Sequence, residues 1–241
     1  MVLKTSQKAG SFLLALVMLL SLTSVFCFKS ASAATDGEGK YELENGGVTI
    51  TGFIGTSRTI SVPSKVNGQR VKKVTALNNN NTKASVTTVS FANGIEEIGT
   101  GVCKGYISLE RVALPDTLVT IGSDAFFNCS SLTGITIPNS VTTIGTNAFN
   151  GCIALISADL SCKATVIPDG LFTGCKSLTT AALPSYTTDI GVAAFSGCSS
   201  LASINIPDTV KTIAKDAFNG CASLKRISLS TELKTIGEMA F

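Results

Sequence analysis

The stretch IGSDAFFNCSSLTGITIPNSVTT, from Ile121 to Thr143, is one period of a repeat that fills most of this 241-residue chain. The same landmark side chains recur every 23 residues before and after it. The recurring phenylalanines are Phe126, Phe149, Phe172, Phe195, Phe218 and Phe241. The recurring cysteines are Cys129, Cys152, Cys175, Cys198 and Cys221, and the recurring isoleucines are Ile98, Ile121, Ile144, Ile167, Ile190, Ile213 and Ile236. A fixed period of this length predicts a solenoid, in which each position forms a column in one continuous core.

Each period contains one predicted β-strand. Ile135 and Ile137 alternate with Thr136, which is the pattern of a strand with one buried face. Pro138 ends this strand, because proline cannot donate to a hydrogen-bond ladder. The equivalent residue is also proline at Pro115, Pro184 and Pro207.

One helical turn is predicted around each phenylalanine. Asp124 and Asn147 lie two residues before the ring and are favourable N-cap residues. The residue that ends each turn belongs to a column of glycine and asparagine, the types that most readily adopt positive φ. This column consists of Gly105, Asn128, Gly151, Gly174, Gly197 and Gly220. The predicted fold class is therefore α/β, a solenoid of 23-residue coils with parallel strands and short helical turns.

Residues 1–33 have the composition of a secretory signal peptide. Lys4 and Lys8 precede an apolar run from Ser11 to Phe28, and Ala31-Ser32-Ala33 provides a small-residue cleavage pattern. The alternative is an uncleaved membrane anchor, because a run of 18 residues is just long enough to span a bilayer. After removal of the leader, we expect no membrane insertion and a secreted or cell-surface location.

Charge and composition exclude several classes of function. Removing Lys4, Lys8 and Lys29 with the leader leaves 16 basic residues against 16 acidic ones. A neutral chain lacks the basic surface that nucleic-acid phosphates require, so no nucleic-acid partner is expected. The chain contains no histidine, which removes Ser-His-Asp triads and imidazole general bases. The carboxylates are assigned to turns and caps, and the sequence predicts no enzyme activity and no catalytic, cofactor-binding or metal-binding residue.

The region between the leader and the regular coils is predicted to be a β-rich cap over residues 34–74, followed by the solenoid over residues 75–241. Asn45-Gly46-Gly47 and Asn67-Gly68 are both flanked by apolar residues, which is a hairpin signal. Such a cap would cover the apolar side chains and the unpaired strand of the first coil. Because the last coil stops at Phe241 in mid-period, the solenoid is expected to be truncated there.

The repeat unit resembles the leucine-rich repeat of BspA-like surface proteins. The segment GGVTITGFIGTSRTISVPSKVNGQRV, from Gly46 to Val71, also resembles the way those repeat arrays begin. The resemblance covers residues 40–241, with departures such as Cys103 in the phenylalanine column and Tyr106 in the cysteine column. It implies a leucine-rich repeat fold and a secreted or surface-displayed binding module, often one that adheres to host proteins or other cells. It implies no catalytic residues.

The cysteine column has two chemical interpretations. Stacked coils lie about 4.8 Å apart, which is within the Cα separation of a disulfide. However, seven cysteines remain once Cys27 is removed with the leader, and Phe126, Cys129 and Leu132 recur like one inward-facing stripe. The sequence therefore favours buried reduced thiols that serve as small apolar residues. A zinc site is disfavoured because there is no CxxC pair and no histidine.

The outward face of the predicted strands is the candidate binding surface. Residues that alternate with the buried strand positions must point outward. The candidate ligand-binding residues are Arg111, Thr136, Asp159, Thr180, Ser203, Asn205, Arg226 and Ser228. A flat face without a deep pocket favours an extracellular protein or glycan over a small molecule. The loops, or a basic edge formed by Lys211, Lys225 and Lys234, are the alternative sites.

Three functions remain open from the sequence. The chain can act as a surface adhesion or recognition module through the solenoid face. It can be the non-catalytic targeting region of a longer secreted enzyme. It can also be a structural spacer in an extracellular layer.

Overall fold

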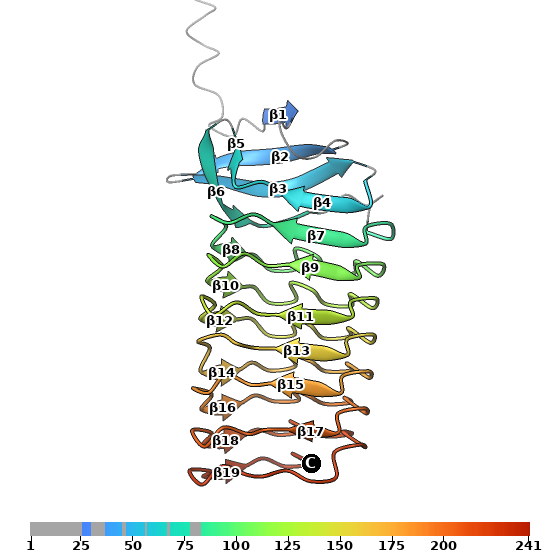
Figure 1. The fold of residues 1–241 in the computed structure, drawn as a ribbon, viewed down its shortest axis with the longest axis vertical. Helices are drawn as coiled ribbons and strands as arrows, with labels where there is room; N and C mark the ends of the chain where they lie inside the picture. Colours follow the sequence, from blue (N-terminus) through green and yellow to red (C-terminus); the bar gives the residue numbers. More distant parts are fainter. Residues whose placement is uncertain (1–25, 30–36, 45–46, 56, 67, 78–82) are drawn as a thin grey trace, which may run out of the picture.

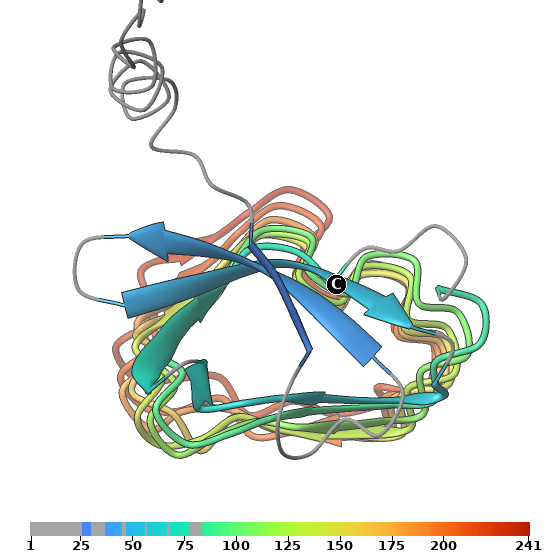
Figure 2. The ribbon, with the colours of Figure 1, turned by 90° about the horizontal axis from the view of Figure 1, so that it is seen from above.

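The computed structural model describes residues 26–29, 37–44, 47–55, 57–66, 68–77 and 83–241. These residues wind into a stack of coils, one above the next along a single axis (Figure 1). Seen along that axis, successive coils lie almost directly over one another (Figure 2). Each regular coil has a long-strand side, whose strand has three or four residues except for two in β17 (Ser203–Ile204), a side with a two-residue strand and a side made of turns.

Parallel strands line two of these sides. The long-strand side consists of β4 (Thr59–Val62), β7 (Thr88–Phe91), β9 (Arg111–Ala113), β11 (Gly134–Thr136), β13 (Ser157–Asp159), β15 (Thr180–Ala182) and β17 (Ser203–Ile204). The short-strand side consists of β8 (Glu97–Ile98), β10 (Thr120–Ile121), β12 (Thr143–Ile144), β14 (Val166–Ile167), β16 (Asp189–Ile190), β18 (Thr212–Ile213) and β19 (Thr235–Ile236). The pairing places Ser157 beside Thr180 and Ile121 beside Ile144, so the register repeats every 23 residues as the sequence predicts.

The turn side corrects the predicted fold class, because no helix is present among the described residues. Asp124 and Asn147, expected as N-caps, instead have φ of 55° and 56°, in the left-handed region. The glycine and asparagine column is confirmed, since Asn128 and Gly151 also have positive φ. Three residues between two left-handed positions are too few to build consecutive α-helical hydrogen bonds.

The backbone of the turn side bonds between coils instead of within a helix. The amides of Asp124, Phe126 and Asn128 donate to carbonyl oxygens of the next coil, at N···O distances of 2.8–2.9 Å. The amide of Phe127 donates to the carbonyl of Asp124 at 3.0 Å, which closes a tight turn within the coil. Every second amide of the turn therefore donates to the neighbouring coil. An α-helix is excluded because its amides would have to donate to carbonyls within the same coil.

The core is a set of columns that run along the solenoid axis. The phenylalanine rings from Phe126 to Phe241 stack, with centroids 5.2–5.7 Å apart. The rings of Phe126, Phe149, Phe172 and Phe195 have no exposed surface. Where Cys103 replaces phenylalanine, Tyr106 brings a ring into the cysteine column. Its hydroxyl donates to the carbonyl of Leu77 at 2.6 Å.

The cysteines are buried free thiols, as the sequence favours. All seven cysteines from Cys103 to Cys221 are unpaired and buried. From Cys152 to Cys221, each thiol of the column donates to the carbonyl of the preceding coil's phenylalanine, for example Cys152 to Phe126 at 3.3 Å and Cys175 to Phe149 at 3.2 Å. Cys129 donates to the carbonyl of Cys103 at 3.2 Å, because Cys103 replaces phenylalanine in that coil. The same carbonyls also accept the backbone amide of the cysteine in their own coil, as Phe126 does from Cys129 at 3.2 Å, so each thiol shares an acceptor that the backbone already uses.

The N-terminal part adds antiparallel strands above the coils. Strands β1 (Phe26–Lys29), β2 (Gly37–Glu44) and β3 (Gly47–Gly55) pair antiparallel in that order, and β5 (Lys65–Val66) pairs antiparallel with β6 (Gln69–Val74). Strands β4 and β6 pair in parallel with β7 and β8, so the parallel ladder already begins within residues 34–74. Apart from β1, the expected leader lies outside the described residues. Among the described residues, no helix is long and apolar enough to cross a membrane.

The left-handed column predicts a stabilising substitution at Ala193, which has φ of 53°. Left-handed backbone costs a residue with a Cβ about 1–2 kcal/mol, and glycine is free of that cost but loses more entropy on folding. We expect Ala193→Gly to raise the free energy of unfolding by about 0.5–1 kcal/mol in urea titrations. The matched control is Ala194→Gly, at a buried residue outside the positive-φ set, which should lower it. A loss of stability in Ala193→Gly would contradict the backbone assignment.

Candidate functional site

The candidate ligand-binding residues lie along the long-strand side. Arg111 starts β9, Thr136 ends β11, Asp159 ends β13, and Thr180 and Ser203 start β15 and β17. Pairing places Ser157, Thr180 and Ser203 in one column, and Thr136 beside Asp159 in the next. Asn205 follows β17 directly, whereas Arg226 and Ser228 lie outside any strand. All eight are exposed except Asp159, which is half-buried.

The polarity of this face varies along the axis. Arg111 lies toward the N-terminal end and pairs with Glu110 at 3.4 Å, while Arg226 lies toward the C-terminal end. Between them, the Asp159 carboxylate accepts a hydrogen bond from the Ser161 hydroxyl at 2.6 Å. Among the described residues, the side chains of Thr136, Thr180, Ser203 and Asn205 have no hydrogen-bond partner in the protein. Their polar groups are therefore free to bond to a ligand.

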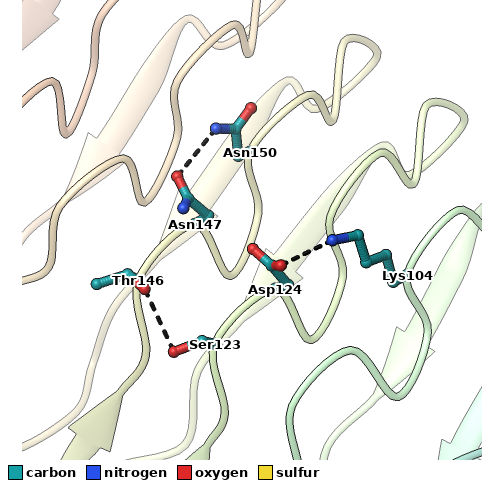
Figure 3. A network of polar contacts seen from close by, with 6 residues as sticks. All are labelled: Lys104, Ser123, Asp124, Thr146, Asn147 and Asn150. Atoms are coloured by element: carbon teal, nitrogen blue, oxygen red, sulfur yellow. Dashed lines mark hydrogen bonds and ion pairs between the residues drawn. The ribbon is translucent and has the colours of Figure 1, made fainter.

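The turn side differs, because many of its polar groups bond to one another. Lys104 pairs with Asp124 at 2.8 Å, Thr146 donates to Ser123 at 3.3 Å and Asn150 donates to Asn147 at 3.0 Å (Figure 3). The Lys104 ammonium also lies 4.7 Å from the centroid of the Phe127 ring. These contacts hold adjacent coils and the tight turns in place, so this side is a structural edge.

Two exposed apolar residues near the candidate face were not selected from the sequence. Ile156, directly before β13, is 52% exposed, and Tyr186, four residues after β15, is 63% exposed. They lie beyond opposite ends of the strands and add apolar contact area at the two rims. The only sequence signal for these two residues was that each is apolar or aromatic at a repeat position that is polar in most other coils.

The buried thiols do not form a reactive site. Burial raises the pKa of Cys152 to about 12 and that of Cys221 to about 11, and it raises the pKa of Cys103 and Cys198 as well. A thiol with a raised pKa has little nucleophilic thiolate near neutral pH. Within the described residues, no three or more Asp, Glu or Cys side chains are grouped so that they could hold a metal ion.

The comparisons with known proteins agree with this geometry. A family model for the BspA type leucine-rich repeat region matches six copies, over residues 78–201 and 165–241, which is more than half of the chain. The chain belongs to the BspA-type leucine-rich repeat family. A search of curated proteins found no match.

Solved structures of bacterial leucine-rich repeat proteins are similar to this chain. The leucine-rich repeat protein of T. pallidum is 28% identical, with a TM-score of 0.62, and the match covers 86% of each chain. A leucine-rich repeat protein from Eubacterium ventriosum is 22% identical, with a TM-score of 0.62, over 76% of this chain and 58% of the other. Because its sequence identity is this low, the similarity to the Eubacterium ventriosum protein shows the fold alone.

Proposed function

We propose that this BspA-type repeat protein is a secreted or cell-surface recognition module, and that it binds an extracellular macromolecule through the long-strand side. The observation that carries the proposal is the row of exposed, unpartnered polar groups at Thr136, Thr180, Ser203 and Asn205. Thr136, Thr180 and Ser203 lie on parallel strands, and Asn205 directly follows β17. Such a surface accommodates an extended protein or glycan chain. Family membership supports a non-catalytic binding role, and the predicted leader over residues 1–33 supports export.

Affinity at each site is expected to be modest. Apart from Tyr186 and Ile156, the surroundings of the face offer few large apolar side chains, and such residues usually dominate binding energy. Useful adhesion would then depend on many copies displayed together, because multivalency multiplies weak contacts. The two alternative functions differ in their need for a ligand. A targeting region of a longer enzyme would bind through the same face, whereas a structural spacer would need no ligand.

The test changes the face and leaves the core columns intact. Thr136→Lys, Thr180→Glu and Asn205→Lys are combined in one variant, since all three positions are exposed. The immobilised protein is screened against matrix proteins and glycans, and any ligand found is titrated against parent and variant. We expect the variant to bind at least about tenfold more weakly, which corresponds to about 1.4 kcal/mol.

A matched control places the same charges on the short-strand side, which also carries exposed residues. This control combines Thr143→Lys, Val166→Glu and Thr235→Lys. Unchanged binding in the control together with loss in the first variant supports the long-strand side. The reverse pattern would assign binding to the short-strand side, and equal binding in all three proteins would rule out both.

A further inference from the structure

The ladder of the short-strand side is interrupted between β12 and β14 (Figure 1). Strands β8, β10 and β12 belong to one sheet and β14, β16, β18 and β19 to another. The other two sides of the same coils stay connected, since β11 pairs with β13 and the amide of Asn147 donates to the carbonyl of Asp169 at 3.0 Å. We call this one-sided interruption, between Thr142–Ile144 and Thr165–Pro168, the seam.

Pro168 removes one of the hydrogen bonds that close this side elsewhere. Its equivalents each donate an amide to the isoleucine carbonyl of the coil before, and they are Gly122, Gly145, Gly191, Ala214 and Gly237. Gly145, for example, donates to Ile121 at 2.7 Å. Proline has no amide hydrogen, so the carbonyl of Ile144 lacks this donor. The proline ring also needs room at a corner where a Cβ added to Gly145 would overlap the backbone of the coil before.

The amide of Thr165 is the second donor that the seam lacks. In the coil before, the equivalent amide of Thr142 donates to the carbonyl of Val119 at 3.0 Å. Among the described residues, the Thr165 amide makes no such bond to Thr142. The amide of Lys163 donates to the carbonyl of Val141 instead, at 2.8 Å. One displaced hydrogen bond therefore replaces two regular ones.

Side chains at the seam are also packed less closely. Ile144 is 8% exposed, whereas its equivalents in the two adjacent coils have no exposed surface. Ala164 stands where the coil before buries the larger Val141. Cys162 is turned inward and only 4% exposed, although the equivalent residues of the other coils are exposed. The seam thus has fewer hydrogen bonds and less buried apolar volume than the neighbouring coil junctions.

We propose that the seam opens locally: the coils of β12 and β14 part on the short-strand side while the long-strand and turn sides stay paired. Local opening begins where hydrogen bonds and buried apolar contacts are fewest. Each opening exposes the thiol of Cys162. The solenoid then bends toward the paired sides, which changes the curvature of the long-strand side between β11 and β13. The seam opens whether or not that side binds a ligand.

Alkylation of the native protein with iodoacetamide, followed by mass mapping, tests the opening. We expect Cys162 to react at least about tenfold faster than Cys152 and Cys175, which lie in the continuous column. Pro168→Gly restores a backbone donor at the seam, and we expect it to slow the reaction of Cys162 at least about fivefold. A Cys162 that is protected like the column thiols in the parent protein would overturn the proposal.

The direction of the change in Pro168→Gly separates local opening from general destabilisation. Glycine in place of proline raises the entropy of the unfolded chain, so global unfolding becomes easier. A thiol that reacts only through global unfolding would therefore react faster in this variant. The matched control is Pro184→Gly, in the column of strand-ending prolines, where we expect Cys162 to react no more slowly than in the parent. A Cys162 rate that is unchanged or higher in Pro168→Gly would contradict the assignment of the seam to Pro168.

Amide hydrogen exchange of the parent protein locates the opening without any substitution. The amide of Ile137 donates to the carbonyl of Asp159 at 2.7 Å, across the same two coils on the long-strand side. We expect the Lys163 amide, which bonds across the seam, to have a protection factor at least about tenfold lower than that of Ile137. The Thr142 amide, one coil earlier on the short-strand side, should be protected like Ile137. Equal protection of Lys163 and Ile137 would show that the two sides open together or not at all, and would overturn the proposal.

Discussion

Phe195→Ala is expected to lower the free energy of unfolding by about 3–5 kcal/mol, as is usual for deleting a fully buried aromatic side chain. The ring has no exposed surface and stacks on Phe172 at 5.5 Å and on Phe218 at 5.2 Å. Its removal therefore leaves a cavity between two coils that the rigid ladder cannot close. Urea unfolding followed by circular dichroism measures the loss.

The phenylalanine column contains its own control for this substitution. Phe241→Ala makes the same change where only one ring face is covered and the side chain is 53% exposed, so we expect a loss of about 1 kcal/mol. Because coils contact only their neighbours, the loss of amide protection in Phe195→Ala should be greatest near residues 172–218. Similar losses at the two positions would contradict the column arrangement.

Alkaline pH is expected to unfold the protein through its buried thiols. Below pH 9 a cysteine is neutral in both the folded and the unfolded state, so it contributes no pH dependence. Above pH 9.0, the ordinary thiol pKa, the unfolded thiols ionise. Burial keeps the folded thiols protonated until about pH 11 at Cys221 and about pH 12 at Cys152. Stability must therefore fall as the pH rises through this window.

The size of this effect follows from the number of thiols involved. Each fully buried thiol removes about 1.4 kcal/mol per pH unit above its unfolded pKa. Cys103, Cys129, Cys152, Cys175 and Cys198 have no exposed surface. Their contributions add, so the fall in stability is steep once the pH is well above 9.

Urea midpoints measured under reducing conditions at pH 8, 9 and 10 test this expectation. A variant combining Cys152→Ala and Cys175→Ala should show a shallower pH slope, by roughly 2 kcal/mol between pH 9 and pH 10, because two thiols no longer contribute. A parent protein whose stability is constant from pH 9 to pH 10 would show that the column is not buried in the reduced form.

The sequence by itself determined the repeat, the register and the core. An identical apolar residue every 23 positions can be buried only if successive coils stack, so Phe126, Cys129 and Leu132 were predictable as one inward stripe. The need for positive φ at Gly105, Asn128 and Gly151 was equally readable, because few residue types adopt it. The outward positions of Thr136 and Thr180 follow from the same periodicity.

Only the tertiary structure decided how the turn side is built and which surfaces remain open. Asp124 and Asn147 favour helix N-caps and left-handed turns alike, and a single coil viewed alone does not distinguish the two. The choice depends on the next coil, whose carbonyls take the amides of Asp124 and Phe126 and leave none for a helix. Hydrogen bonds between coils also decide which polar side chains remain free. Many on the turn side are already bonded, whereas those of Thr136 and Thr180 on the strands have no partner in the part of the chain that the structure describes. Because such bonds join residues a full period apart, local propensity does not specify them.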